Sequence, residues 1–446
     1  MIVDKEFDLD LSRSKALNEK IHHLIPGGSH TYSKGDDQFP EEYLPIMARG
    51  KGCHAWDVDG NRFIEYGIGL RSVTLGHAFA PVVEAAYAQM QKGANFTRPS
   101  SIELEAAETF LSVVPGAEMV KFCKNGSDAT TAALKLARAV TGRDMVAICG
   151  DHPFFSIDDW FIGSTSIDRG IPASIKNLTT TFKFNDLTSL QQAFDRYPHR
   201  IACIFMEAEK NEAPAERYLQ KVQELCHAHG ALFILDEMIT GFRWHLGGAQ
   251  TLYQVQPDLS CFGKAMGNGF AISALTGKRE FMELGGLYHD QERVFLLSTT
   301  HGAETHALAA FIAVVQAYQT HDVIQKIHRQ GHMLSRGLKD VIKRHKLEDY
   351  VRILGHPSCL VCATSDHQGP GSQPFRTLLL QETMKRGVIA PNLVVSSAHE
   401  DGEINKTIEV FDEALAIYRM ALDEGIEKYL NGRSIQPVYR KLNGNV

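Results

Sequence analysis

The 446-residue chain lacks a long uninterrupted apolar run. The longest, from Ala307 to Val315, is too short to span a bilayer. The opening residues, MIVDKEFDLD, alternate charged and apolar side chains and do not form the apolar core of a signal peptide. These features predict a cytoplasmic protein with no membrane partner.

The chain also lacks an excess of charge of one sign. It has 46 Lys and Arg against 53 Asp and Glu, which gives a formal net charge of −7 and a pI near 6.3. This balance provides no general attraction to nucleic acid, so any anion has to be bound by local groups. We therefore expect small-molecule partners and no nucleic acid.

Cysteine is sparse, with eight residues in the whole chain. Cys359 and Cys362 form a CxxC, but they lie inside the strand-like run SCLVCAT. No second Cys or His pair follows at the spacing of a zinc site. The sequence predicts a core strand here and no metal site.

What the sequence does contain is a regular alternation of strand and helix patterns. Apolar strand-like runs at 120–123, 145–149, 201–206 and 231–237 are separated by amphipathic helical patterns. Such alternation is typical of a parallel sheet covered by helices, which is an α/β fold.

The flanking regions have a different character. Residues 1–75 carry many turn signals and little periodicity, which predicts an irregular wrapping segment that belongs to a small domain. Residues 76–305 are expected to form the large α/β domain, and residues 306–446, with their long helical patterns, the smaller α+β domain. The last twenty residues are polar, and we expect a loose tail.

Two residues in the middle of the chain indicate a cofactor. Asp236 ends the apolar run ALFILDE, and Lys264 follows a second apolar stretch just before a glycine-rich turn. A desolvated lysine has a lowered pKa and becomes nucleophilic enough to form a Schiff base. Pyridoxal phosphate needs such a lysine and also a carboxylate that keeps its pyridine nitrogen protonated. The pair predicts this cofactor.

A phosphate site is expected directly after the 120–123 strand, where Gly126 and Ser127 open a helix. The backbone N–H groups and the positive end of the helix dipole favour an anion. Taken alone, the same residues are also typical of a helix cap. A second hydroxyl-rich turn, from Ser298 to Gly302, precedes a later helix and allows the same two interpretations.

These residues resemble those of class III, fold-type I pyridoxal-phosphate enzymes, and within them the glutamate-semialdehyde aminomutase branch. The similarity runs from WDVDGNRFIEY through GSDA and the segment LDEMITGFRWHLGGAQ…FGKAMGNG to SSAH near the C-terminus. The resemblance implies that Lys264 is the aldimine lysine, Asp236 the pyridinium partner, and Gly126 and Ser127 phosphate ligands. It also implies a homodimer, in which Thr299, or the adjacent Thr300, completes the phosphate site of the neighbouring subunit.

The sequence departs from this family in the segments expected to contact the ring and the substrate. Where the family commonly has an aromatic residue before a histidine, this chain has Asp151–His152–Pro153, so Phe154 and Phe155 become the candidates for stacking on the ring. The aminomutases place an arginine shortly after Pro–Gly–Gly, whereas this chain reads PGGSHTYSKGDD, with Lys34 near that position.

Arginines near the changed loops are the candidates for binding a substrate carboxylate. Arg71 lies in the small, apolar segment GIGLRSVTLGH, and a guanidinium there can hold a carboxylate through two hydrogen bonds. Arg98, in NFTRPSS, is a second candidate that a structural ion pair would also explain. Arg243 is expected to have the structural role of fixing the strand that carries Asp236.

The predicted reaction is the transfer of an amino group from a small amine donor to a keto or aldehyde acceptor, through the Lys264 aldimine and pyridoxamine phosphate. The nearest alternative is an aminomutase that moves the amine within one amino-aldehyde. A decarboxylase, a racemase, a nucleotide-binding α/β protein and a non-catalytic binding protein are further alternatives. The nucleotide-binding alternative conflicts with the sequence, because FGKAMGNG has its lysine in the wrong place for a P-loop.

Overall fold

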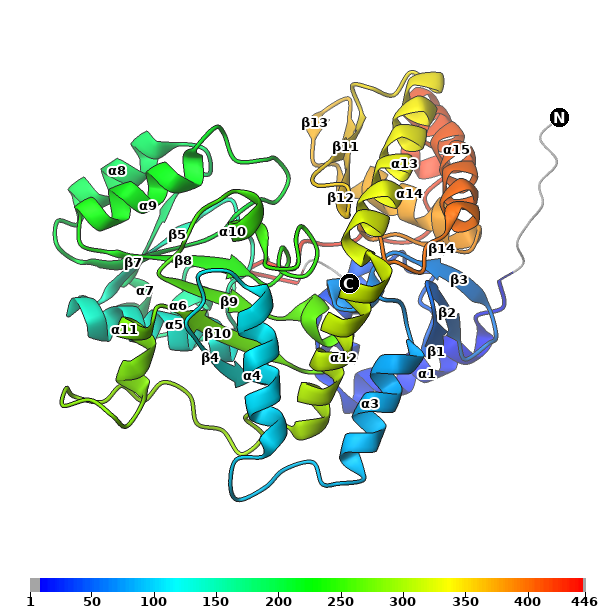
Figure 1. Ribbon diagram of the computed structural model, residues 1–446. Coiled ribbons are helices and arrows are strands. Elements are labelled where there is room, and N and C mark those ends of the chain that lie inside the picture. The colour runs from blue at the N-terminus through cyan, green and yellow to red at the C-terminus, as the bar shows by residue number, and fades with distance from the viewer. Residues whose placement is uncertain (1–8, 444–446) are drawn as a thin grey trace. The chain divides into compact units, whose positions relative to one another are not determined.

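The structure is a computed structural model that describes residues 9–443 (Figure 1). Most of the N-terminal stretch MIVDKEFDLD lies outside the described residues. The chain divides into two compact units. Unit 1 comprises Met1–Ile68, Leu75–Ala78 and Gln325–Val446, and unit 2 comprises Gly69–Thr74 and Phe79–Ile324.

Unit 2 is built on a seven-stranded sheet that is mostly parallel (Figure 1). Its strands, in spatial order, are β4 (Met119–Cys123), β10 (Ser273–Gly277), β9 (Leu259–Phe262), β8 (Leu232–Glu237), β7 (Ile201–Glu207), β5 (Met145–Cys149) and β6 (Thr179–Phe182). Strand β10 runs antiparallel to both of its neighbours, and the remaining neighbours are parallel. The predicted α/β fold with a mostly parallel sheet is confirmed.

The central strands are buried at every position, as expected for strands covered on both faces. Helices α5 (Gly126–Thr141) and α9 (Tyr218–Ala228) pack on the sheet. Helix α12 (Thr305–His321) packs along α3 (Ala80–Met90) and α4 (Ser101–Val113) (Figure 1). The predicted limits assign α12 to the small domain, but its buried apolar residues pack within unit 2.

The described part of unit 1 contains two small sheets, and the C-terminal part of the chain adds three long helices to it. One sheet joins β1 (Met47–Lys51), β2 (His54–Asp57), β3 (Arg62–Glu65) and β14 (Val388–Ile389), and the other is formed by β11 (Val351–Leu354), β12 (Cys359–Asp366), β13 (Gly369–Pro370) and β15 (Leu393–Val394). The long helices are α13 (Val323–Arg344), α14 (Gln373–Lys385) and α15 (Asp401–Glu424). The expected core strand at Cys359 is β12, where Cys359 is buried.

Two expectations about the ends of the chain were wrong. The described residues before 75, from residue 9 on, are not irregular throughout, because they include helix α1 (Ser12–Leu24) and strands β1 to β3. Strands of four or five residues are too short to reveal a period in the sequence. The described C-terminal residues, up to residue 443, are not a loose tail either. Ile435 is buried, and the N–H of Gln436 donates to the carbonyl oxygen of Asp37 at 2.9 Å.

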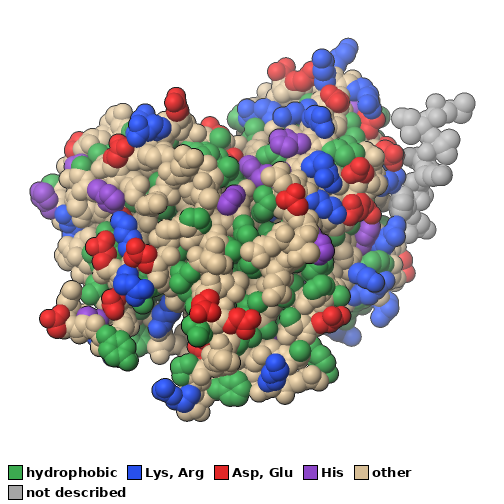
Figure 2. Space-filling model, viewed as in Figure 1, with side chains coloured by type: hydrophobic (Ala, Val, Ile, Leu, Met, Phe, Trp, Pro, Cys, Tyr) green, Lys and Arg blue, Asp and Glu red, His purple; other side chains and the backbone are tan. Residues whose placement is uncertain are grey.

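No helix among residues 9–443 combines the length and the apolar character needed to cross a bilayer. Figure 2 shows basic and acidic side chains interspersed over the visible face, in keeping with the near balance of charge in the sequence. The cytoplasmic location stays a prediction.

Candidate functional site

Three charged residues lie at one edge of the unit 2 sheet, where the parallel strands β7, β8 and β9 end. Asp236 near the end of β8 pairs in register with Glu207 at the end of β7. Asp236 also pairs with Cys261 of β9, three residues before Lys264. The carboxyl edge of an α/β sheet is the usual place for a ligand. The sheet therefore brings Asp236 and Lys264, predicted from the sequence, to the same edge.

Lys264 is the first residue of a short 3-10 turn after β9 and has a positive φ of 45°. Burial lowers the pKa of its amine, although the acids Asp236 and Glu207 act to raise it. Two cations, Arg71 and Arg243, lower the pKa further. An amine with a lowered pKa is neutral more of the time and is a better nucleophile.

Asp236 is only 2% exposed, and its Oδ1 accepts the N–H of Met238 at 2.9 Å. Burial raises the pKa of this carboxyl to about 8, with a further increase from Glu207 and an opposing effect of Lys264. Within residues 9–443 no ion pair joins Asp236. A carboxyl with such a raised pKa holds a proton near neutral pH; it can pass this proton to a ring nitrogen of a ligand and then pair with that nitrogen as a carboxylate.

Glu207 is a site residue that the sequence reasoning did not identify. It is 3% exposed, and its Oε2 is buried without a hydrogen-bond partner among the described residues. Burial raises its pKa, while the cations Lys210, Lys264 and Arg71 oppose that increase. The available signal was an apolar strand that ends in an acid, the same pattern that identified Asp236.

The predicted phosphate turn opens helix α5. Asn125 caps this helix, with Asp128 completing a capping box, so the Asp128 carboxylate binds the N–H of Asn125 at 3.1 Å. The N–H groups of Gly126 and Ser127, in the first helical turn, lack partners within the helix and point outward. The Ser127 hydroxyl accepts the N–H of Ile157 at 3.0 Å, so its own hydrogen can be donated to an anion.

Two glycines allow the phosphate turn and the lysine turn to approach the strand that carries Asp236. A Cβ atom on Gly126 would lie 2.9 Å from the sulfur of Met238, and one on Gly263 would lie 2.6 Å from the same sulfur. Neither turn has room for a side chain at these positions. The arrangement fits a cofactor with a ring nitrogen, a carbonyl for the lysine, and a phosphate.

The two aromatic candidates occupy different environments. Phe155 is 2% exposed and packs against Phe161 and Phe205, with ring centroids 5.7 and 5.2 Å away, so it is a core residue. Phe154 is 43% exposed and remains the predicted ring partner of the cofactor. His152, between these residues and β5, accepts the N–H of Glu207 at 3.1 Å through Nδ1, and burial lowers its pKa to about 3.

The remaining predicted residues are not all brought to this edge. Arg71 is partly buried and acts electrostatically on Lys264 and Glu207. Arg98, Thr299 and Thr300 are exposed residues of unit 2, and the Thr300 carbonyl accepts the side-chain amide of Asn95 at 2.9 Å. Lys34 is exposed and belongs to unit 1. Their roles stay predictions.

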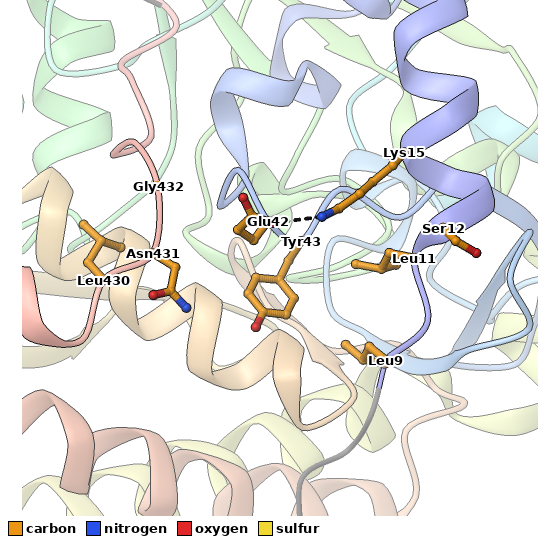
Figure 3. Close-up of a pocket in the computed structure, with 9 residues that line it drawn as sticks. All are labelled: Leu9, Leu11, Ser12, Lys15, Glu42, Tyr43, Leu430, Asn431 and Gly432. Carbon is orange, nitrogen blue, oxygen red and sulfur yellow. Dashed lines mark hydrogen bonds and ion pairs between the residues drawn. The ribbon is translucent and has the colours of Figure 1, made fainter.

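A cavity of about 810 Å³ lies elsewhere, in unit 1, between the start of α1 and the segment after α15 (Figure 3). Leu11 and Tyr43 contribute to its wall, and the ion pair between Lys15 and Glu42, 2.9 Å long, crosses its rim. None of the predicted site residues lines this cavity.

Most of the chain is similar in sequence to proteins of one known family. The sequence pattern of the family described as Aminotransferase class-III matches residues 37–394. The chain belongs to this family. It is 30% identical over 444 residues to a glutamate-1-semialdehyde 2,1-aminomutase of Alkaliphilus metalliredigens, covering 93% of this chain and 98% of that protein. It is 34% identical to the protein of the same name from Desulforudis audaxviator, covering 91% and 98%.

The structural comparison agrees. The FumI protein of Sphingopyxis sp. MTA144, solved with pyridoxal phosphate, is 27% identical and has a TM-score of 0.83, with coverage of 92% of this chain and 98% of that one. The fold is that of fold-type I pyridoxal-phosphate transferases, and pyridoxal 5'-phosphate is the cofactor. The predicted family, fold class and cofactor are confirmed.

Proposed function

We propose that this protein transfers an amino group between a small amine donor and a keto or aldehyde acceptor. The observation that carries the proposal is the pair at the sheet edge, Asp236 and Lys264, with the pKa of the lysine lowered by burial. When bound, the cofactor supplies an electron sink for the carbon that carries the amine.

Each residue has a defined task in this proposal. The amine of Lys264, whose pKa burial lowers, takes a proton from the donor carbon and returns it later in the cycle. Asp236 accepts the N–H of the cofactor ring, and Gly126 and Ser127 bind its phosphate. Phe154 covers one face of the ring. Arg71 binds a substrate carboxylate, and Lys34 and Arg98 are secondary candidates for the same role.

An aminomutase acting within one amino-aldehyde is the second candidate function. Its support is the name of the two relatives at 30% and 34% identity. The opposing feature is Lys34, which stands where the resembling aminomutases have an arginine. A lysine offers a point charge in place of the planar pair of donors that holds a carboxylate.

The test is spectroscopic. The purified protein should be yellow, and its visible band should bleach with an amine donor and return when a keto acid or aldehyde is added. Glutamate-1-semialdehyde supplied alone separates the two functions: turnover without a second substrate indicates the aminomutase. A protein that binds the cofactor but whose band responds to no amine or carbonyl compound would contradict both.

We also propose a homodimer. Val83, Tyr87 and Met90 lie on one face of α3, at i, i+4 and i+7, and are 45%, 62% and 52% exposed. Three large apolar side chains in a row on a surface helix indicate a covered face. Light scattering should give twice the mass of the chain, and Tyr87→Asp should shift the protein toward the monomer. Lys326→Asp, on α13, is the control and should leave the mass unchanged.

A further inference from the structure

Arg71 is the last of four consecutive residues with a positive φ, which form a left-handed turn. Ile68, Gly69, Leu70 and Arg71 have φ values of 44°, 55°, 57° and 74°. For a residue with a Cβ atom this conformation costs about 1–2 kcal/mol, and only one of the four is glycine. Such strain persists only where the surrounding structure holds it.

Arg243 supplies part of that support. It is fully buried, and its Nη2 donates to the carbonyl oxygen of Arg71 and to Oγ1 of Thr74, the latter at 3.2 Å. Its Nε donates to the carbonyl of Ile239 at 3.2 Å, three residues after Asp236. One side chain thus ties the strained turn to the loop that follows β8.

The guanidinium of Arg71 has a free donor. Its Nε is buried without a hydrogen-bond partner among the described residues. The positive charge of Arg71 also acts on Lys264 and Glu207, lowering the pKa of each. A buried donor without a partner favours an incoming acceptor, and a carboxylate offers two oxygens to a guanidinium.

We propose that Arg243 is a positioning residue for substrate recognition: it holds the left-handed turn so that Arg71 binds the carboxylate of an amino acid. The proposal rests on the amino-transfer function and specifies the donor as an amine that carries a carboxylate. Arg71 contacts the substrate, and Arg243 acts through the backbone of the turn.

Matched amines test the specificity. The cofactor band of the holoenzyme is titrated with three pairs that differ by one carboxylate: alanine and ethylamine, β-phenylalanine and 1-phenylethylamine, and 4-aminobutyrate and propylamine. The acid of at least one pair should bleach the band at a lower concentration. Arg71→Met should raise the half-saturating concentration of that acid about 10- to 100-fold more than the half-saturating concentration of its plain amine.

Arg243→Lys keeps the charge but cannot reproduce the forked donors. It should raise the KM for the same acid, with kcat changed little, and leave the plain amine unchanged. Equal loss for both members of the pair would show a merely structural role and overturn the proposal. A band that responds equally to acids and plain amines in the unaltered enzyme also overturns it while keeping the amino-transfer function. A band that responds to none of the six overturns both.

Leu70→Gly tests the strain without touching a buried charge. Glycine adopts a positive φ freely, so the turn should form but hold Arg71 less rigidly. We expect a folded enzyme with a raised KM for the acid. Gln254→Gly is the matched control, because Gln254 is exposed, has a φ of 51° and belongs to the same unit. An unchanged KM in Leu70→Gly would contradict a role for the strained turn.

Discussion

Asp236 in unit 2 and Glu382 in unit 1 are both nearly buried, at 2% and 4% exposure, yet their surroundings differ. Glu382 accepts hydrogen bonds from Lys385 and Arg386 at 2.8 and 2.7 Å. Burial raises its pKa, but these bonds and one from Gln381 outweigh that effect and the pKa is lowered. For Asp236 burial prevails and the pKa rises to about 8.

The comparison separates a carboxylate that forms ion pairs within the fold from one that has none among the described residues. Paired charges recover the free energy lost on leaving water, whereas an unpaired buried acid lowers the stability of the ligand-free protein. A reactive site commonly carries such a cost, because the partner that would remove it is the substrate or cofactor.

The largest contrast is expected between two lysines. Lys264→Ala should lower the rate of amino transfer by several orders of magnitude, because it removes both the nucleophile and the base. Lys385→Ala in unit 1 should keep the rate within about threefold and only weaken the Glu382 cluster. Steady-state rates and the cofactor spectrum measure the difference. Substantial turnover by Lys264→Ala would refute the assignment.

Neutralising each acid should affect a different property: the reaction rate for Asp236 and the stability of the fold for Glu382. Asp236→Asn should slow the reaction about 100- to 1,000-fold while leaving the ligand-free protein as stable as before or more stable. Glu382→Gln should lower the free energy of unfolding by about 1–3 kcal/mol and spare the rate. Urea unfolding and a rate assay on the same preparations give both quantities. A lower free energy of unfolding for Asp236→Asn would contradict the claim that the unpaired Asp236 carboxyl destabilises the ligand-free protein.

The pH dependence of stability should have opposite signs at the two acids. Between the ordinary Asp value of 3.8 and about 8, the folded protein retains a proton on Asp236 that the unfolded chain has released. The free energy of unfolding therefore falls as pH rises through this window. Glu382, with its lowered pKa, stabilises the fold above its ordinary value of 4.5, and that contribution is lost as pH falls through the folded pKa.

Unfolding of the ligand-free protein at a series of pH values checks these signs. The curve of Asp236→Asn should decline less steeply with rising pH than that of the unaltered protein. The curve of Glu382→Gln should differ from the curve of the unaltered protein mainly at acid pH. Parallel curves for the unaltered protein and Asp236→Asn would show that this carboxyl keeps its ordinary pKa.

The smallest effect is expected from Glu207→Gln. Glu207 raises the pKa of Lys264, so its neutralisation should lower that pKa further. The rate at which ligand-free protein takes up pyridoxal phosphate should then reach half its maximum at a lower pH, because the neutral amine attacks. Glu382→Gln should leave this midpoint in place. A shift to higher pH would contradict the electrostatic account.

The sequence was sufficient to predict the family, the cofactor and the parallel part of the sheet, because long apolar runs and an acid at a strand end are local signals. It did not predict the antiparallel direction of β10 or its place between β4 and β9, since pairing partners far apart in the chain leave no local pattern. The segment before residue 75 was misjudged because its strands are short.

A structural role was predicted for Arg243, but its contact with the Arg71 turn was not, and neither was the place of Glu207 beside Asp236. The acid at the end of β7 becomes part of the site only because β7 lies beside β8, and Arg243 reaches Arg71 only through the folded turn. Residue type and spacing report what a side chain can do. Which other side chain it will meet depends on the tertiary arrangement.

Strand β10 has a consequence for how the protein acquires its site during synthesis. It pairs with β4, which leads into the Gly126 turn, and with β9, which leads into Lys264. On a ribosome β4 emerges long before β10, so the phosphate turn lacks its neighbouring strand until most of unit 2 has been made. The arrival of one strand then orders the Gly126 turn and the Lys264 turn together. If these turns bind the cofactor as proposed, a nascent chain that stops before Ser273 should capture no pyridoxal phosphate.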